Sequence, residues 1–213
     1  MSPRYPVLLD LGGRACLVVG GGPVAERKAR GLLAADAHVT LIAPEATEAL
    51  VALAADGRLT WAPRPVTPAD LASAPGGGPW AFVVAATSDR AVNQQVIAAV
   101  DARGWWGNDV SSPSGGPAAL PAVHRDGPLT LAVATDGVHP GAAGWLRDLA
   151  AGAIGPEHLV ALDLVAESRA ASPAGARPDW RAAVDSGMLD LIREGHLAEA
   201  KERLQACLSS SSD

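Results

Sequence analysis

The sequence predicts an α/β fold: a Rossmann-type parallel sheet, then a short β-containing segment, then a C-terminal helical domain. Short apolar runs typical of buried strands alternate with helical patterns over the N-terminal half of the chain. A glycine-rich turn separates the first strand from the first helix, and the chain beyond residue 140 has predominantly helical patterns. We therefore expect divisions at 1–110, 111–139 and 140–213.

Strands and helices of the first domain follow from the hydrophobic pattern. Cys16–Gly20 (CLVVG) is a buried-strand run that ends in glycines, and Trp80–Ala86 (WAFVVAA) is the clearest buried strand. Val24–Ala35 has apolar residues at helical spacing. The other expected elements are strands at Val39–Ala43, Leu59–Pro63 and Trp105–Val110 and helices at Ala46–Ala55 and Ala91–Ala102.

The pattern changes after Ser111. Ser111–Gly116 is rich in turn residues, and Leu129–Thr135 has the composition of a strand. From Pro140 onward we expect helices, because Pro140, Pro156 and Pro178 each stand where a first helical residue would be. We expect the tail Ser209–Asp213 to be disordered.

Composition excludes several classes of protein. Of the 213 residues, 17 are basic and 23 acidic, which gives a net charge of −6, and 48% are hydrophobic. We expect neither nucleic acid nor a membrane surface as a partner, because the chain is acidic and no apolar run approaches the roughly 18 residues of a membrane span. Two cysteines, Cys16 and Cys207, cannot form a disulfide framework or a Cys-ligated zinc site. We expect a cytoplasmic protein with no metal ligands of its own.

A glycine pattern predicts a dinucleotide site. Residues 20–25 read Gly-Gly-Gly-Pro-Val-Ala, which is G-x-G-x-x-A placed between a strand and a helix. Gly20 allows a tight turn, Gly22 lets the backbone approach a pyrophosphate, and Ala25 permits close helix packing. The helix N-terminus supplies amide donors for the anion. The alternative is a tight turn between strand and helix with no ligand.

An acidic residue after the second strand favours NAD over NADP. That strand ends at Ala43-Pro44-Glu45, and Glu45 lies 25 residues past Gly20, near the position of the acid that accepts from an adenine-ribose hydroxyl. No arginine lies close by in the sequence to bind a 2′-phosphate. We therefore expect NAD as the cofactor.

Several segments of residues 4–150, taken together, are more specific than the glycine loop alone. They are YPVLLDLGGRACLVVGGGPVAERKARGLL (5–33), VVAATSDRAVNQQV (83–96), Asn108 after the fifth strand, and PAVHRDGPLTLAVAT (121–135). With these motifs the chain resembles the precorrin-2 dehydrogenase and sirohydrochlorin ferrochelatase family, which includes the N-terminal domain of siroheme synthase.

The resemblance implies NAD-dependent oxidation of the tetrapyrrole precorrin-2 to sirohydrochlorin in siroheme biosynthesis. In many members it implies a second activity, ferrochelatase, for which ferrous iron would be a co-substrate. It also implies a homodimer built through the connector and helical segments. Matched by position, the residues expected to contact the cofactor are Gly20, Gly22, Pro23, Val24, Ala43, Pro44, Glu45 and Thr87.

The chain departs from the family at its expected catalytic acid. The family pattern after the fifth strand is Asn-x-x-Asp, but this chain reads Asn108-Asp109-Val110-Ser111, so Ser111 takes the position of the acid. In an extended segment Asp109 would share a face with Ser111, about 7 Å away. Asp109 is thus our first candidate for the general base. The alternative is a solvated acid at the end of a strand.

A second departure lies in the Ser/Thr-Gly-Gly-x-Ser-Pro loop of the family, which here reads Thr135-Asp136-Gly137-Val138-His139-Pro140. Thr135 keeps a hydroxyl where the family has one near the tetrapyrrole. Asp136 and His139 could replace the missing acid, although a loop histidine is often a solvated turn residue. The candidate catalytic residues are therefore Asp109, Ser111, Thr135 and His139.

The substrate carries many carboxylates, so this acidic chain must bind it through local positive charge. Arg125 lies in the matched region, and with Asn108 and Asp136 it makes up the predicted substrate contacts. We predict an NAD-dependent oxidoreductase. The alternative is an NAD-binding regulatory module of the same fold without turnover, which the serine in place of the acid favours.

Overall fold

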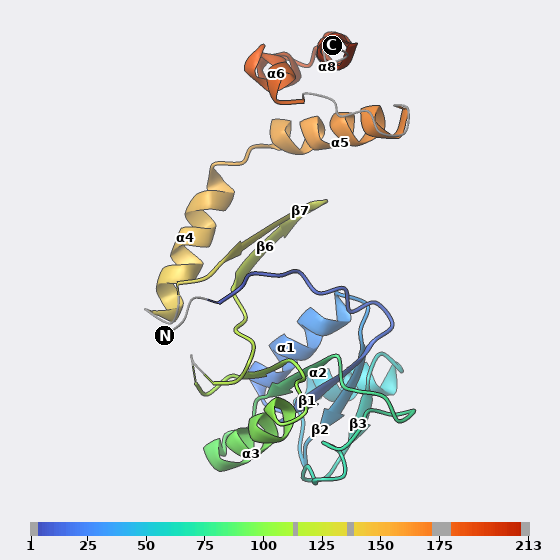
Figure 1. Ribbon diagram of the computed structural model, residues 1–213, viewed down its shortest axis with the longest axis vertical. Helices are drawn as coiled ribbons and strands as arrows, with labels where there is room; N and C mark the ends of the chain where they lie inside the picture. The colour runs from blue at the N-terminus through green and yellow to red at the C-terminus, as the bar shows by residue number, and fades with distance from the viewer. Residues whose placement is uncertain (1–3, 113–114, 136–138, 172–179, 210–213) are drawn as a thin grey trace. The chain divides into compact units, whose positions relative to one another are not determined.

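The computed structural model describes residues 4–112, 115–135, 139–171 and 180–209. Their contacts form two units, of which the first extends to Leu120 and the second runs from Pro121 onward (Figure 1). Each unit has its own buried core. The predicted division of the chain at residues 110 and 139 stays a prediction.

The first unit contains a five-stranded parallel sheet in the order β3-β2-β1-β4-β5. This confirms the predicted Rossmann-type α/β fold. The order reverses between β1 and β4, and in such sheets the crevice at the carboxyl ends of the strands around this point binds ligands. The elements are β1 (Ala15–Val19), α1 (Pro23–Leu33), β2 (His38–Ile42), α2 (Glu48–Ala55), β3 (Thr60–Ala62), β4 (Phe82–Ala85), α3 (Arg90–Asp101) and β5 (Gly107–Asp109).

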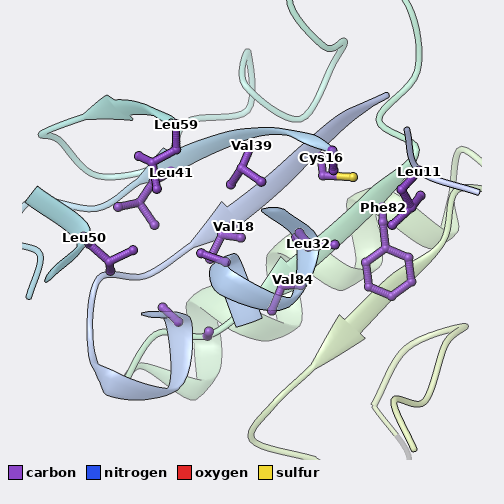
Figure 2. Packing of buried hydrophobic residues seen from close by; sticks show 14 residues of the cluster. Leu11, Cys16, Val18, Leu32, Val39, Leu41, Leu50, Leu59, Phe82 and Val84 are labelled. Carbon is purple, nitrogen blue, oxygen red and sulfur yellow. The ribbon is translucent and has the colours of Figure 1, made fainter. Parts of the chain in front are cut away.

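Helices cover both faces of this sheet, which explains the unbroken apolar runs of its central strands. Val18 of β1 packs in one cluster with Leu32 of α1 and Leu50 of α2 (Figure 2). Its neighbour Val19 points to the opposite face, into a second cluster with Val96 of α3. The sheet is thereby held rigidly between two layers, and its carboxyl edge becomes a fixed platform for the loops described below.

Cys16 belongs to the core of β1. Its side chain is fully buried, and burial raises the pKa of the thiol to about 11, so the thiol stays protonated at neutral pH. Cys16 therefore acts as a small apolar residue of the core.

The second unit begins with an antiparallel hairpin, β6 (Ala122–Asp126) and β7 (Leu129–Val133), on which α4 (Pro140–Gly152) packs (Figure 1). The helices that follow share a core built around Met188 and Leu204. Pro140 and Pro156 begin helices as predicted, whereas Pro178 and residues 210–213 lie outside the described residues. The remaining helices are α5 (Pro156–Ala171), α6 (Trp180–Asp185), α7 (Met188–Arg193) and α8 (Leu197–Ser209). Ser209, the first residue of the tail that was expected to be disordered, is the last residue of helix α8.

A helix that crosses a membrane must be both long and apolar. Within the described ranges, no single helix is both long and apolar enough to cross a bilayer. One pair, Gly141–Gly152 with Pro156–Ala171, reaches the necessary length and composition only together, and it is bent by 73°.

Candidate functional site

Gly20 forms the corner after β1, and its surroundings admit only glycine. Its φ is 118°, which residues with a side chain rarely adopt. A Cβ atom here would overlap the carbonyl oxygen of Ala86, the residue after β4. The Gly20 amide donates to the carbonyl of Ile42 at the end of β2 (3.0 Å). The corner therefore joins the carboxyl ends of three strands at the point where the strand order reverses.

The loop after β2 is anchored to the same corner. A Cβ atom on Gly21 would overlap the carbonyl oxygen of Glu45, so the two backbones touch. The Thr47 amide donates to the Gly21 carbonyl (2.9 Å), and the Thr47 hydroxyl donates to the Glu26 carboxylate of α1 (2.8 Å). Hydrogen bonds from Thr47 and Arg30 hold the pKa of Glu26 below its usual range, so this acceptor is charged at neutral pH. These contacts hold the exposed Glu45 beside the glycine corner.

Gly22 has open space where the two glycines before it have none. A Cβ atom on Gly22 would meet no described atom within 4 Å. Gly22 is the N-cap of α1 and gives it no side-chain cap, and Pro23 has no N–H, so the amides of Val24 and Ala25 are the first donors of the helix. Open space above an uncapped helix N-terminus is the arrangement that a pyrophosphate requires. The residues present therefore fit a dinucleotide.

A cavity of ≈ 210 Å³ opens beside the corner, at the carboxyl ends of β1 and β2. Its wall is mostly apolar, and the polar side chains among its lining residues are those of Thr87 and Gln95. Such a pocket, apolar with few polar groups, is typical of a nucleotide site. The structure thus places four predicted cofactor residues around one cavity and the other four on the adjoining loops and helix; the four that line it are Gly20, Ala43, Pro44 and Thr87.

Asn93, which the sequence reasoning did not single out, holds Thr87 in place. Its side chain is fully buried in α3. Its Oδ1 accepts from the Thr87 amide (3.0 Å) and hydroxyl (2.8 Å), and its Nδ2 donates to the Thr87 carbonyl (3.1 Å). The sequence did contain a signal for this role: Asn93 shares the core-facing positions of α3 with Val96 and Val100, and a buried polar residue must have hydrogen-bond partners.

Asp109 and Ser111 are in direct contact. Asp109 Oδ1 accepts from the Ser111 amide (2.8 Å) and from its hydroxyl (2.6 Å). The expected separation of about 7 Å for an extended chain is therefore wrong, because β5 ends at Asp109 and the next two residues form a turn. Asp109 is only 4% exposed, which differs from a freely solvated acid. The serine in the position of the family's acid thus orients the neighbouring carboxylate.

Asp109 lines a second cavity, of ≈ 530 Å³, together with Arg90, Gln94 and Asp101 of α3. The residues of α3 that line the first cavity, Val92 and Gln95, are on a different face of the helix. Asp109 and Thr87 therefore belong to different cavities. They nevertheless follow adjacent strands, because Asp109 pairs with Ala85, two residues before Thr87.

Asn108 holds the segment that leaves the sheet. Its Nδ2 donates to the Ala118 carbonyl (3.1 Å), and the Ala118 amide donates to the Gly107 carbonyl (3.0 Å). With a side chain only 9% exposed, Asn108 fixes this segment beside β5. Its predicted contact with the substrate stays a prediction.

Three further predicted residues lie in the second unit. Arg125 is exposed on β6, and Thr135 follows β7 and is half-buried. His139 is the N-cap of α4: its Nδ1 accepts from the Gly141 amide (3.0 Å). This bond leaves Nε2 as the nitrogen that carries the proton in the neutral ring, so His139 presents a donor. Asp136 lies outside the described residues.

Comparison with known proteins gives the following matches. A family model described as putative NAD(P)-binding matches residues 7–122. Siroheme synthase 1 of Aeromonas salmonicida is 33% identical over 205 residues, which cover 92% of this chain and 42% of that protein. Siroheme synthase of Chromobacterium violaceum is 40% identical over 143 residues, which cover 67% and 29%. The chain thus spans less than half the length of these curated relatives.

A solved structure resembles nearly the whole chain. SirC, a precorrin-2 dehydrogenase, superimposes with a TM-score of 0.71 at 28% sequence identity, and the match covers 96% of this chain and 98% of that one. The likeness therefore extends past the nucleotide-binding unit into the hairpin and the C-terminal helices.

Proposed function

Because the chain belongs to the putative NAD(P)-binding family whose model matches residues 7–122, we propose that it is an NAD-dependent precorrin-2 dehydrogenase. It would oxidise precorrin-2 to sirohydrochlorin in siroheme biosynthesis. The observation that carries the proposal is the glycine corner at the reversal of strand order, with the open space at Gly22 above the helix N-terminus. The likeness to SirC and to siroheme synthases supports the choice of substrate.

Two features support NAD over NADP. Glu45 is held beside the glycine corner, where its carboxylate would accept from a ribose hydroxyl and repel a 2′-phosphate. Arg64 precedes Pro65 in the wall of the cavity, but its guanidinium makes two hydrogen bonds of 2.7 Å to Asp70. This pairing holds the pKa of Asp70 well below its usual range, so Arg64 stays engaged by a charged partner at neutral pH.

In the proposed mechanism the protein positions two reactants and accepts a proton. Bound NAD would supply the hydride acceptor. The amides of Val24 and Ala25 would bind the pyrophosphate, and the cavity wall would exclude water from the nicotinamide end. Asp109, oriented through Oδ1 by Ser111, would take the proton that leaves the substrate.

The second unit would supply contacts to the substrate. Arg125 is exposed and carries the positive charge that a polycarboxylate requires. The Nε2–H of His139 can donate to a carboxylate while its Nδ1 caps α4. The hydroxyl of Thr135 can donate to a carboxylate as well. We propose these three residues as tetrapyrrole contacts.

We further propose that two copies of the chain pair through α4. From Gly141 to Gly152 no side chain of this helix is buried within its own unit. Trp145 is 65% exposed and Leu149 is 61% exposed on the same face, four residues apart. An apolar stripe of this kind on a soluble helix is typical of a protein interface. A second copy would supply an identical stripe across a two-fold axis.

Replacing Trp145 by Glu is expected to separate the dimer. A charge in the centre of an apolar interface should raise the dissociation constant by about 30-fold or more. Mass measurement during size-exclusion chromatography, over a series of protein concentrations, would show the shift. Trp106→Glu is the matched control, because Trp106 is 50% exposed but lies beside the sheet of the first unit. Equal masses for both variants at every concentration would contradict the α4 interface.

An NAD-binding regulatory module without turnover is the alternative, and the serine at position 111 favours it. Mixing purified protein with precorrin-2 and NAD without oxygen distinguishes the two. The dehydrogenase forms NADH and sirohydrochlorin in equal amounts, and forms much less product with NADP. The module binds NAD and forms neither product.

Iron insertion is the second activity implied by the resemblance. It would require a base that removes protons from the pyrrole nitrogens, and Asp109 is the carboxylate at the second cavity best placed for this by its orientation. In the residues that the structure describes, no group of three or more His, Cys, Asp or Glu side chains is arranged to hold a metal ion. In this activity iron is a substrate, and the tetrapyrrole itself would bind it.

A further inference from the structure

We propose that the Thr87 hydroxyl is fixed as a hydrogen-bond acceptor, so the cofactor group that lies against it must be a donor. Three kinds of group on NAD have this chemistry: the N–H₂ of the nicotinamide carboxamide, the N–H₂ of adenine and the ribose hydroxyls. This inference rests on the proposed binding of NAD. It specifies the chemistry of the cofactor group that lies against Thr87, and it gives Asn93 the role of a positioning residue.

The orientation of the Asn93 amide follows from its backbone partner. The Thr87 amide can only donate, so the Asn93 atom that lies 3.0 Å from it must be the oxygen, Oδ1. The nitrogen, Nδ2, then lies against the Thr87 carbonyl, at 3.1 Å, where it can donate. Exchanging the two atoms would set two donors against each other and two acceptors against each other. The orientation is therefore unambiguous.

The Thr87 hydroxyl has two acceptors within reach on the protein. Its Oγ1 lies 2.8 Å from Asn93 Oδ1 and 2.8 Å from the Asp89 carbonyl. A hydroxyl has one proton, and here either neighbour can take it. Turning that proton toward a ligand would give up the hydrogen bond that it makes to one of these two acceptors. What remains for the ligand are the lone pairs of Oγ1, which can accept but cannot bind a phosphate or carboxylate oxygen.

The position of Thr87 is fixed as firmly as its polarity. On one side, a Cβ atom on Gly20 would come within 2.9 Å of the Thr87 amide nitrogen, so the glycine corner lies directly against this peptide. On the other side, the fully buried Asn93 binds both the N–H and the C=O of Thr87. Because Thr87 is one of two polar side chains in the cavity wall, its orientation decides which ligand atoms can be bound there.

A comparison of NAD with its acetylpyridine analogue tests this inference. The analogue carries a methyl ketone in place of the carboxamide and so lacks the N–H₂ donor. If that donor binds Thr87, the wild type should bind the analogue about three- to tenfold more weakly than NAD, which corresponds to one hydrogen bond. Thr87→Val should bind both equally, and Thr87→Ser should restore the preference. Dissociation constants from calorimetry give the ratios.

A ribose or adenine donor gives a different pattern. The wild type would then bind both dinucleotides equally, and Thr87→Val would weaken both by about the same three- to tenfold factor. Unchanged affinity of Thr87→Val for both would overturn the inference while leaving NAD binding intact. Failure of the wild type to bind NAD at all would overturn the proposed function and this inference with it.

Asn93→Ala separates positioning from a purely structural role. Loss of three hydrogen bonds should lower the unfolding midpoint, and it should also bring the NAD-to-analogue ratio toward that of Thr87→Val. A lower midpoint with an unchanged ratio would show that Asn93 only stabilises the fold. Asn93→Asp provides a second variant if the alanine variant does not fold: its Oδ1 keeps both acceptor contacts, and its second oxygen opposes the Thr87 carbonyl. A reduced ratio in Asn93→Asp supports positioning, and the wild-type ratio contradicts it.

Discussion

Replacing Asp109 by Asn is expected to lower kcat for precorrin-2 oxidation by about 100-fold or more, because the proton acceptor is lost. The substitution is nearly isosteric, and Asn Oδ1 can still accept from the Ser111 amide and hydroxyl. The turn after β5 should therefore survive. We expect the dissociation constant for NAD to stay unchanged, because Asp109 lines a cavity separate from that of Thr87. Steady-state kinetics and calorimetry measure the two quantities.

Ser111→Ala is the control for this prediction. It removes the hydroxyl donor, 2.6 Å from Asp109 Oδ1, but keeps the backbone amide donor. We expect kcat to fall by about tenfold or less, because the carboxylate remains and loses only one of the two hydrogen bonds that it accepts from Ser111. If Asp109→Asn retained the wild-type rate, Asp109 would not be the base. A larger loss in Ser111→Ala than in Asp109→Asn would assign the proton transfer to the serine side chain.

Replacing Gly22 by Asp is expected to weaken NAD binding strongly without damaging the fold. The added Cβ meets no described atom within 4 Å, and aspartate is a better helix N-cap than glycine. The unfolding midpoint should therefore stay the same or rise. A carboxylate in the space that we assign to the pyrophosphate should weaken NAD binding by about 100-fold, through charge repulsion and loss of the amide donors. Calorimetric titration and thermal unfolding report the two effects.

Gly31→Asp supplies the matched control. It adds the same charge to the same helix, also in open space, but nine residues further along, about 13 Å from Gly22. NAD affinity should change little. By contrast, Gly20→Ala should lower the unfolding midpoint, because its Cβ overlaps the Ala86 carbonyl and its φ is 118°. Normal NAD affinity in Gly22→Asp would show that the pyrophosphate binds elsewhere.

Much of the nucleotide-binding unit could be predicted from the sequence, because its signals are local. Strands buried on both faces read as apolar runs, so Cys16–Gly20 and Trp80–Ala86 were assigned to within two residues of β1 and β4. The glycine turn was located because only small residues fit its close contacts at Gly20 and Gly21. The apolar runs and the glycine pattern can each be recognised within a short stretch of the chain, although the contacts of Gly20 and Gly21 are with Ala86 and Glu45.

Contacts that depend on tertiary packing could not be predicted in the same way. The Asp109–Ser111 hydrogen bonds were missed because an extended and a turning chain after Asn108 have the same residue pattern. The spacing of Asn93 with Val96 and Val100 indicates burial, but its partner Thr87 lies before the helix, and the sequence does not show that the two side chains meet. β6 was not assigned as a strand by itself, because His124, Arg125 and Asp126 give it little apolar character. Only its pairing with β7 makes it a strand.

A crystal structure of the protein with NAD is the decisive test of the proposed cofactor site. We expect pyrophosphate oxygens within hydrogen-bond distance of the first amides of α1, in the space above Gly22, with the adenine ribose at Glu45. We also expect the nicotinamide end beside Thr87, on the side of the sheet where Asp109 follows β5. NAD bound away from Gly22, or with its nicotinamide turned to the Glu45 end, would contradict the proposed site.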